Sequence, residues 1–272
     1  MAWSLPRVLR HLRPELAHFQ HAVPIGWKGR TVVTLHDLSF ERDATAMGRL
    51  DRATFKLVVP RAARRAEHVL AVSERTKRDV VELYGVPAEK VTVTTNGVDP
   101  VFSPGANGGS GDYVLFVGAI QRRKDPLAAL AAAREVGLPL VVAGPEKEPE
   151  LARELAAGGA DLRGYVATTE LAALYRGAAA VVLPSRYEGF GLPVLEAMAC
   201  GAPVVAADEP ALREVGGDAA VYANDREFGA AVRRALDERE VRVAAGLERA
   251  KLFSWAETAR RTADVYRLVL SG

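Results

Sequence analysis

The chain of 272 residues contains a single cysteine, Cys200, and therefore cannot form an internal disulfide. Free thiols are typical of reducing compartments, and we interpret Cys200 as a small core residue. No apolar run reaches the roughly 18 residues needed to cross a bilayer. The opening MAWSLPRVLRHLRP has no apolar core of signal-peptide length. These features predict a cytoplasmic protein.

The sequence also lacks the common metal-binding patterns. It has no Asp-x-Asp triplet, and its histidines and cysteine form no cluster with metal-ligand spacing. We therefore expect no metal and no cofactor. An anionic ligand would then be neutralised by Lys, Arg and the N–H groups at a helix start.

The bulk composition is that of a globular protein. Hydrophobic residues make up 49% and charged residues 26%, and the length suits one large or two ordinary domains. The net charge of +2 divides into +5 over residues 1–110 and −3 over the remainder. This basic bias could attract an anionic acceptor or a lipid surface, although a solvated helix face would produce the same bias.

Short β-branched runs alternate with longer amphipathic segments along the chain, which favours parallel sheets with helical crossovers. The nearly unbroken apolar runs indicate strands that are covered on both faces. The predicted strands are residues 16–19, 31–36, 68–73, 91–95, 113–119, 139–144, 162–166, 180–184, 203–208 and 219–223. The predicted helices are residues 47–66, a helix capped by Ser73, 125–136, 149–157, 168–177, 192–200, and 225–270 with a break near Phe253.

One segment shows neither the spacing of apolar residues that is typical of a helix nor that of a strand. Residues 100–112, PVFSPGANGGSGD, are rich in Gly, Ser and Pro, which is typical of a linker. The alternation of strands and helices restarts after this segment. We therefore predict a first domain over residues 1–103, a linker over 104–112, and a second domain that starts at residue 113.

The most informative segment is PSRYEGFGLPVLEAMACGAPVV, residues 184–205, which follows a predicted strand and opens a predicted helix. Gly189 and Gly191 allow a ligand to approach the backbone closely, and Pro193 suits the start of a helix. Free N–H groups and a positive dipole end make such a helix start a natural diphosphate site. Glu196, one turn later, could accept hydrogen bonds from the vicinal hydroxyls of a ribose. Such turns also serve ordinary packing.

The same segment resembles the Glu-x-Phe-Gly-x-x-x-x-Glu signature of family-four, or group 1, retaining glycosyltransferases, which have the GT-B fold. VLFVGAIQRRKDP, LRGYV with LAALYRGA, PALREVGGDAAVY and FSWAETARRTADVYRLVL are also similar to blocks of this family, as are TVVTLHDLSF, HVLAVSERTKRDV and VTTNGVD in the first half. The resemblance implies an α/β fold of two Rossmann-like domains that face each other across a cleft. The second, nucleotide-sugar-binding domain would span residues 113–254, and a closing helix, 255–272, would cross back to the first, acceptor-side domain.

The resemblance also implies which residues bind the donor. Arg123 and Lys124 match the pair that meets the donor diphosphate, and Arg122 is a neighbour that could be mistaken for Arg123. Glu188 resembles the residue that contacts the transferred sugar, and we predict it to be catalytic. The other implied donor-binding positions are Phe190 and Gly191, whose amides would bind sugar hydroxyls, Leu192, whose amide would face phosphate, and Glu196, which would hold the ribose.

Three assignments compete with simpler explanations. Tyr165 and Val166 lie where the family's nucleobase packs, but Tyr165 could equally be a core aromatic at a strand end. A lone histidine at a strand end, such as His36, is more often structural than catalytic. Here HD follows TVVTL as in the family's first domain, where that histidine faces the donor sugar, so we predict His36 to be catalytic. The cations at 122–124 could also belong to a solvated loop.

The sequence departs from the family at its start. The family's first domain opens with a strand, a Gly-rich loop and a helix, and this chain has no segment that resembles them. PELAH stands where the family has PDxxH, so we expect about two βα units of roughly 30 residues each to be missing. The first domain is therefore predicted to be incomplete, either through truncation or through a misplaced start codon.

Together these features predict a retaining glycosyltransferase that transfers a hexose from GDP- or UDP-hexose to a glycan or a lipid-linked acceptor. Mannose or glucose is favoured because PALREVGGDAAVY resembles transferases of surface-polysaccharide biosynthesis. Peripheral association with the inner face of the membrane is expected, and a nucleic-acid partner is not. The alternative is a truncated, non-catalytic fragment or subunit that binds nucleotide sugar.

Overall fold

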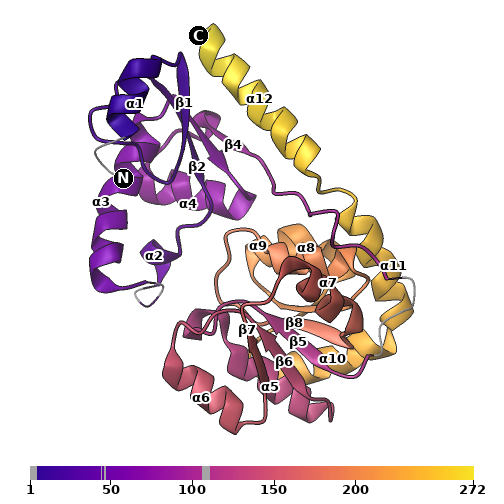
Figure 1. Cartoon of the computed structure of the whole chain (residues 1–272). Helices are drawn as coiled ribbons and strands as arrows, with labels where there is room; N and C mark the ends of the chain where they lie inside the picture. The colour runs from indigo at the N-terminus through magenta and orange to yellow at the C-terminus, as the bar shows by residue number, and fades with distance from the viewer. Residues whose placement is uncertain (1–4, 44, 46, 106–110) are drawn as a thin grey trace. The chain divides into compact units, whose positions relative to one another are not determined.

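The computed structural model describes residues 5–43, 45, 47–105 and 111–272. The middle of the predicted linker, residues 106–110, lies outside this description. The chain divides into two compact units, of which the first comprises Met1–Asn96 with Trp255–Gly272 and the second comprises Gly97–Ser254. Each unit contains a parallel sheet packed with helices (Figure 1), which confirms the predicted α/β class.

The first unit is built on a four-stranded parallel sheet in the order β1-β2-β3-β4. Its strands are β1 (Leu16–Gln20), β2 (Arg30–Leu35), β3 (His68–Ala71) and β4 (Val91–Val93). Residues of the central strands β2 and β3 are buried almost throughout. This burial is expected for strands that are covered on both faces, and it explains their unbroken apolar runs.

The described residues of the first unit also form five α-helices and a short 3-10 helix, η1 (Ala88–Lys90). The α-helices are α1 (Leu5–Leu12), α2 (Ser39–Arg42), α3 (Arg49–Arg65), α4 (Glu74–Tyr84) and α12 (Trp255–Ser271). Helix α4 begins where the sequence predicts, because the Ser73 hydroxyl accepts a hydrogen bond from the Thr76 amide at 3.0 Å. It ends at Gly85, whose φ of 65° suits glycine.

The last helix of the chain packs within the first unit. Val265 and Val269 of α12 form a small buried cluster with Val32 of β2 and Leu70 of β3. Arg30 donates hydrogen bonds to the last two carbonyls before Ser271, at distances of 2.9 and 2.8 Å. These bonds satisfy carbonyl groups that the end of a helix otherwise leaves without partners.

The second unit is built on a six-stranded parallel sheet in the order β10-β9-β8-β5-β6-β7. The strands are β5 (Val114–Val117), β6 (Leu140–Ala143), β7 (Asp161–Gly164), β8 (Ala180–Leu183), β9 (Val204–Ala207) and β10 (Val221–Ala223). Counted outward from β5, this is the doubly wound Rossmann order. The order reverses between β5 and β8, and ligands of such sheets bind at the carboxyl ends of the strands at this point.

Seven α-helices are described in the second unit, together with three short 3-10 helices, η2 (Arg122–Lys124), η3 (Gly217–Ala219) and η4 (Asp225–Glu227). The α-helices are α5 (Pro126–Glu135), α6 (Pro149–Ala157), α7 (Thr168–Gly177), α8 (Leu192–Ala199), α9 (Pro210–Gly216), α10 (Phe228–Asp237) and α11 (Arg239–Ala250). One hydrophobic core of the unit lies between the sheet and helices α5, α6 and α10. No helix in the described ranges is long and apolar enough to span a bilayer.

The boundary between the units differs from the predicted one. The first unit ends at Asn96 and not at residue 103. Residues 97–103 belong to the second unit because Phe102 is buried and packs edge-to-face on Tyr175, with ring centroids 5.8 Å apart. Arg176 also donates hydrogen bonds to two backbone carbonyls of this segment.

Several helices differ from those that the sequence predicts. It does not predict α1, α2 or α9. Helix α2 is a single turn, which is too short to show a helical period. Helix α9 has only seven residues and ends at a Gly-Gly pair, a pattern more typical of a loop. The predicted helix 225–270 is interrupted at Glu238 as well as before Trp255.

Candidate functional site

Most candidate residues of the second unit gather where the strand order reverses, whereas Tyr165 and Val166 follow β7 at the edge of the sheet. The η2 turn follows β5, and the loop at residues 184–191 connects β8 to α8. These two connections touch, because the Arg186 amide donates to the Arg123 carbonyl at 3.0 Å. The sheet therefore brings two loops that are distant in sequence to the carboxyl ends of adjacent strands, where α/β sheets bind their ligands.

Arg123 and Lys124 both face the carboxylate of Glu188. Lys124 Nζ donates to Glu188 Oε1, and Arg123 Nη1 lies 4.0 Å from Glu188 Oε2. The three side chains are 12–15% exposed. Arg123 Nη1 also donates to the Tyr187 carbonyl, whereas its buried Nε has no hydrogen-bond partner. Two cations and one carboxylate thus share a sheltered position that solvent still reaches.

Arg122 is separated from this group. Its side chain is 66% exposed, and its Nε lies 3.4 Å from Glu148 Oε2. Its backbone amide donates to the other oxygen of Glu148 at 2.9 Å. Within η2, therefore, Arg123 and Lys124 are the cations next to Glu188, which resolves an ambiguity that the three successive basic residues leave in the sequence.

Helix α8 starts beside this group without a side-chain cap. Gly191, its N-cap, has a φ of 108°, and a Cβ there would lie 2.9 Å from Leu212 Cδ2, so only glycine fits. In contrast, α9 is capped by Glu209, whose carboxylate accepts from the amides of Ala211 and Leu212. Of these two neighbouring helices, α8 is the one that no side chain caps. Pro193 has no N–H and the Val194 amide donates to the Gly191 carbonyl, so the Leu192 amide is the donor at this helix start that can serve an anion.

Phe190 and Leu192 flank Gly191 and differ in what they can offer a ligand. The Phe190 side chain is buried and packs edge-to-face on Phe253, with ring centroids 5.9 Å apart. Its backbone is then the part that could contact a ligand. Leu192 is the first residue of α8 and Pro193 the second.

Glu196 lies on the second turn of α8 and is held by a residue that the sequence does not indicate. The Tyr175 hydroxyl donates to Glu196 Oε2 at 2.8 Å. Burial raises the pKa of the Glu196 carboxyl and the negative charge of Asp99 adds to the rise, whereas the hydrogen bond from Tyr175 lowers it. Tyr175 thus fixes one carboxylate oxygen in place and leaves the other to accept from a ligand.

Tyr165 is not the core aromatic that one of the two sequence interpretations predicts. Strand β7 ends at Gly164, and the Tyr165 side chain that follows is 87% exposed. The sequence LRGYV has a strand-like composition, but the chain turns at Gly164, where φ is 63°. Val166 is half-buried. The exposed position of Tyr165 leaves the other interpretation open, in which this side chain packs against a nucleobase.

His36 lies in the first unit, directly after β2. Its Nε2 contacts Gln20 Oε1, from the end of the neighbouring strand β1. The His21 ring lies 5.3 Å from the His36 ring, centroid to centroid. Burial lowers the pKa of His36, and Asp37 partly opposes this effect. An amide oxygen beside Nε2 favours the tautomer with a proton there, which leaves Nδ1 as an acceptor.

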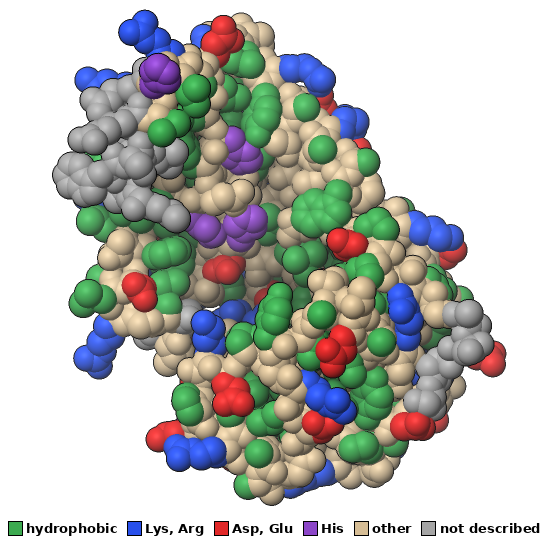
Figure 2. All heavy atoms as spheres, viewed as in Figure 1, with side chains coloured by type: hydrophobic (Ala, Val, Ile, Leu, Met, Phe, Trp, Pro, Cys, Tyr) green, Lys and Arg blue, Asp and Glu red, His purple; other side chains and the backbone are tan. Residues whose placement is uncertain are grey.

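Histidine side chains gather on the surface that Figure 2 shows, and all five histidines of the chain belong to the first unit. Burial also lowers the pKa values of His18 and His21, and the nearby His36 lowers both further. His18 contacts the hydroxyls of Tyr266 and Thr34, at 2.6 and 2.7 Å. The imidazoles of His18, His21 and His36 are therefore largely neutral at pH 7.

Comparison with known proteins is consistent with this geometry. A family model described as "Glycosyl transferases group 1" matches residues 111–238, and one described as "Glycosyltransferase Family 4" matches residues 1–102. The chain is 32% identical to D-inositol 3-phosphate glycosyltransferase 2 of Catenulispora acidiphila over 92% of its own length and 69% of that protein. The chain belongs to the group 1 glycosyltransferases.

Other relatives of this glycosyltransferase chain are more distant in length or in sequence. It is 30% identical to O-antigen chain mannosyltransferase B of Escherichia coli over 75% of its own length, and it spans only 61% of that protein. The structure of sucrose-phosphate synthase from Thermosynechococcus elongatus superposes with a TM-score of 0.83 at 20% identity, covering 99% of this chain and 77% of that one. Anabaena HepE in complex with UDP-glucose superposes with a TM-score of 0.74 at 18% identity, covering 88% and 72%. The structural matches establish the GT-B fold.

Two residues that contact candidate residues, one in each unit, escape sequence reasoning. Tyr175 lies 21 residues before Glu196 on another helix, and Gln20 lies 16 residues before His36 on another strand. No local spacing indicates either pair, although the parallel pairing of β1 with β2 would bring Gln20 near residue 36. Within the described residues, no group of three or more His, Cys, Asp or Glu is placed to hold a metal ion.

Proposed function

We propose that this protein transfers a hexosyl group from a nucleotide-diphosphate sugar to a glycan or lipid-linked acceptor with retention of anomeric configuration. The observation that carries the proposal is the position of Arg123 and Lys124 beside Glu188 and the start of α8, at the reversal point of a Rossmann sheet. Cations, a carboxylate and an uncapped helix start are the groups that a sugar diphosphate requires.

The two cations and the helix start would neutralise the leaving diphosphate without a metal ion. Each charge-assisted hydrogen bond contributes roughly 1.5–3 kcal/mol. The Arg123 guanidinium, whose Nε has no hydrogen-bond partner, and the Leu192 amide at the uncapped start of α8 would supply donors to the phosphate. These donors are held in place before the ligand binds, so little reorganisation is needed as charge develops on the phosphate.

The carboxylates would have separate tasks. Glu188 would accept hydrogen bonds from hydroxyls of the transferred sugar, and its contact with Lys124 would link the sugar to the diphosphate. Glu196 would accept from the ribose hydroxyls through the oxygen that Tyr175 does not occupy. We propose Phe190 and Gly191 as backbone donors to sugar hydroxyls, Leu192 as an amide donor to phosphate, and Tyr165 with Val166 as the surface that supports the nucleobase.

The proposed reaction proceeds on one face of the sugar. No carboxylate can be assigned as a nucleophile, because the two acids of the site are each held in another contact. We propose that the departing phosphate oxygen accepts the proton of the acceptor hydroxyl while the acceptor oxygen bonds to the anomeric carbon. On the family resemblance, His36 would contact the sugar. Analysis of the product anomer tests this mechanism, and an inverted product would contradict it.

The donor is proposed to be GDP- or UDP-hexose, with mannose or glucose favoured. A mannosyltransferase among the relatives supports mannose, and the HepE structure holds UDP-glucose. The test is a thermal-shift panel of GDP-, UDP- and ADP-sugars, because a ligand at 100 times its dissociation constant stabilises a protein by about 2.7 kcal/mol. Stabilisation by one nucleotide class, lost in Lys124→Ala and kept in Arg122→Ala, would identify the donor.

The acceptor and the site of action remain proposals as well. We propose a cytoplasmic protein that associates peripherally with the membrane carrying its acceptor, because residues 1–110 have a net charge of +5. A sedimentation assay with anionic vesicles tests this association. Donor binding without any transfer or hydrolysis would instead favour a non-catalytic nucleotide-sugar-binding subunit.

A further inference from the structure

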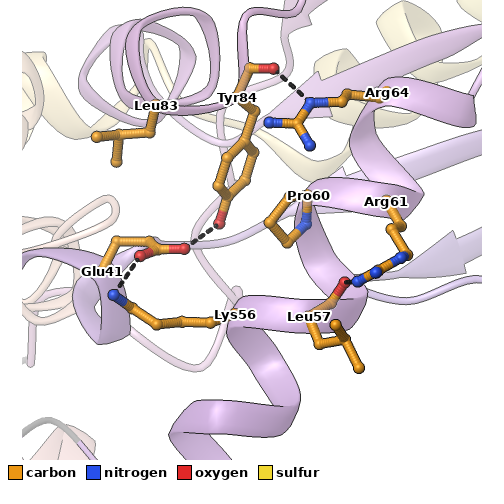
Figure 3. A pocket seen from close by; sticks show the side chains of 8 residues that line it. All are labelled: Glu41, Lys56, Leu57, Pro60, Arg61, Arg64, Leu83 and Tyr84. Atoms are coloured by element: carbon orange, nitrogen blue, oxygen red, sulfur yellow. Dashed lines mark hydrogen bonds and ion pairs between the residues drawn. The ribbon is translucent and has the colours of Figure 1, made fainter.

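The first unit contains a pocket that includes none of the residues discussed above. It has a volume of about 390 Å³, which lies in the range of small-molecule sites. Its walls come from α2, α3 and α4 (Figure 3), and they are formed by Glu41, Lys56, Leu57, Pro60, Arg61, Arg64, Leu83 and Tyr84. Three cations and one carboxylate line it, so its net charge is positive.

The single carboxylate of the pocket is already occupied. Glu41 Oε2 pairs with Lys56 Nζ at 2.9 Å, and Glu41 Oε1 accepts from the Tyr84 hydroxyl at 3.3 Å. Lys56 is thereby neutralised, and the Tyr84 ring is fixed across the pocket (Figure 3). The positive charge that remains comes from Arg61 and Arg64.

Arg61 and Arg64 are oriented by the backbone and not by acidic side chains. Arg61 Nη1 donates to the Leu57 carbonyl at 2.6 Å, and Arg64 Nε donates to the Tyr84 carbonyl at 2.8 Å. Within the described ranges, neither guanidinium pairs with a carboxylate. Residues three apart on a helix share a face. Two guanidinium groups with unused N–H donors therefore line the same pocket.

Apolar surface lies next to these guanidiniums. Leu57 is 54% exposed and Leu83 is 37% exposed, although both are large hydrophobic residues on helices. Pro60 adds a rigid, buried ring to the same wall. A ligand that fits the pocket would thus combine an anionic group with an apolar portion.

We propose that this pocket binds a phosphate ester, with its phosphate between Arg61 and Arg64 and its apolar substituent along Leu57 and Leu83. A phosphomonoester carries a charge of about −1.5 to −2 at pH 7 and three acceptor oxygens. It thus matches two guanidiniums, whose planar donors suit phosphate geometry. The ester could be a soluble metabolite or the headgroup of an anionic lipid, since both present the same chemistry.

The direct test is calorimetric titration of the full chain with phenyl phosphate and, as the uncharged counterpart, phenol. The proposed diphosphate site could also bind phosphate, so the titration is repeated in the Lys124→Ala background. We expect phenyl phosphate to bind in both backgrounds and phenol to bind in neither. Binding that disappears with Lys124 would assign the phosphate to the other site and overturn the proposal.

Substitutions then locate the bound phosphate. Arg61→Gln should weaken phenyl phosphate binding about tenfold or more, since it removes a charge-assisted hydrogen bond. This variant should fold, because Arg61 is exposed and its described hydrogen bond is to the backbone of its own helix. Arg64→Lys keeps the charge but loses the planar fork, and it should weaken binding less. Arg78→Gln, an exposed arginine of α4 outside the pocket, is the matched control. Equal losses in Arg61→Gln and Arg78→Gln would reduce the effect to bulk charge and refute the pocket.

The source of the ester is decided with vesicles. Vesicles of phosphatidylcholine with phosphatidic acid are compared with phosphatidylcholine alone, for the wild type and for Arg61→Gln. Sedimentation that requires both phosphatidic acid and Arg61 would identify a lipid headgroup. Phenyl phosphate binding that requires Arg61, without such sedimentation, would identify a soluble ester. Failure of both arms would overturn the proposal and leave the proposed transferase function untouched.

Discussion

The two units use different chemistry at the ends of their strands. The second unit gathers Arg123, Lys124 and the start of α8, and it contains no histidine. The first unit contains all five histidines, and those near the ends of β1 and β2 have lowered pKa values. The first unit should therefore be the one whose stability responds to mild acid.

The largest effect is expected for Lys124→Ala. Removing one preorganised donor from a developing phosphate charge should lower the transfer rate about 10²–10³-fold, whether the product is a glycoside or free sugar. The measurement is steady-state turnover of the donor identified by thermal shift. Arg122→Ala is the matched control, because that side chain faces Glu148 and solvent. Similar losses of activity in the two variants would contradict a specific role of Lys124, since activity would then depend only on the overall positive charge of the second unit.

A smaller effect is expected for Glu196→Gln. This change preserves shape but removes an ionised acceptor, so affinity for a ribonucleoside diphosphate should fall about tenfold. The 2′-deoxy analogue should lose less, because it lacks one of the two hydroxyls that Glu196 would hold. Calorimetry on both nucleotides provides the measurement, and equal losses would reject the ribose assignment.

Tyr175→Phe tests the ribose assignment of Glu196 through the pKa of that carboxyl. The hydrogen bond from Tyr175 lowers the pKa of Glu196, so its removal should raise that pKa. Ribonucleotide affinity in the variant should therefore begin to weaken at a higher pH than in the wild type as the solution is acidified. A pH series that shows the same curve for both proteins would contradict this coupling.

Acid should destabilise the first unit before the second. The pKa values of His18, His21 and His36 are lowered by burial, whereas in the unfolded chain they return to about 6.5. The unfolded chain therefore binds more protons in mild acid. The resulting stability is fully present above about pH 6.5 and is lost as the pH falls through the lowered folded values. Hydrogen exchange, corrected for intrinsic rates, should show protection falling in β1 and β2 while β5 and β8 keep theirs. An equal loss of protection in both sheets would contradict the prediction that the first unit is the more sensitive to acid.

The smallest effect on stability is expected for Tyr165→Ala. An exposed side chain away from any hydrogen-bond network usually changes the free energy of unfolding by no more than about 0.5 kcal/mol, and Tyr165 is 87% exposed. Its effect on binding should separate ligands. Affinity for a nucleoside diphosphate should fall, and affinity for pyrophosphate should not. Unchanged affinity for both would remove Tyr165 from the nucleobase surface.

The sequence predicts which helices and strands exist far better than it predicts where they end and which elements they pack against. Helix 168–177 is correct to the residue, and every predicted strand is present within a few residues, because apolar period and Gly or Pro breaks are local signals. The unit boundary is wrong by several residues because Phe102 packs on Tyr175, which is far away in sequence. A polar, Gly-rich segment indicates where the chain is not regular. It does not indicate which core the residues before it join.

The candidate site likewise contains residues that the sequence identifies and residues that only the structure reveals. The resemblance to family motifs identifies Arg123, Lys124 and Glu188, which follow predicted strands whose carboxyl ends a parallel sheet brings together. The motif match selects Arg123 over its neighbour Arg122, but only the structure shows that Arg122 is directed towards Glu148. The roles of Tyr175 and Gln20 depend on contacts between separate elements. The exposure of Tyr165 follows from the turn at Gly164, and composition does not reveal that turn.

The placement of α12 has a consequence for the order in which this protein can fold during synthesis. A ribosome completes residues 1–96 first, then the whole of the second unit, and only afterwards the helix that covers Val32 and Leu70. At roughly 5–20 residues per second, this interval lasts on the order of ten to thirty seconds. For that time the nascent first unit exposes an apolar face to the cell, and chaperones have a defined surface and a defined period in which to bind it.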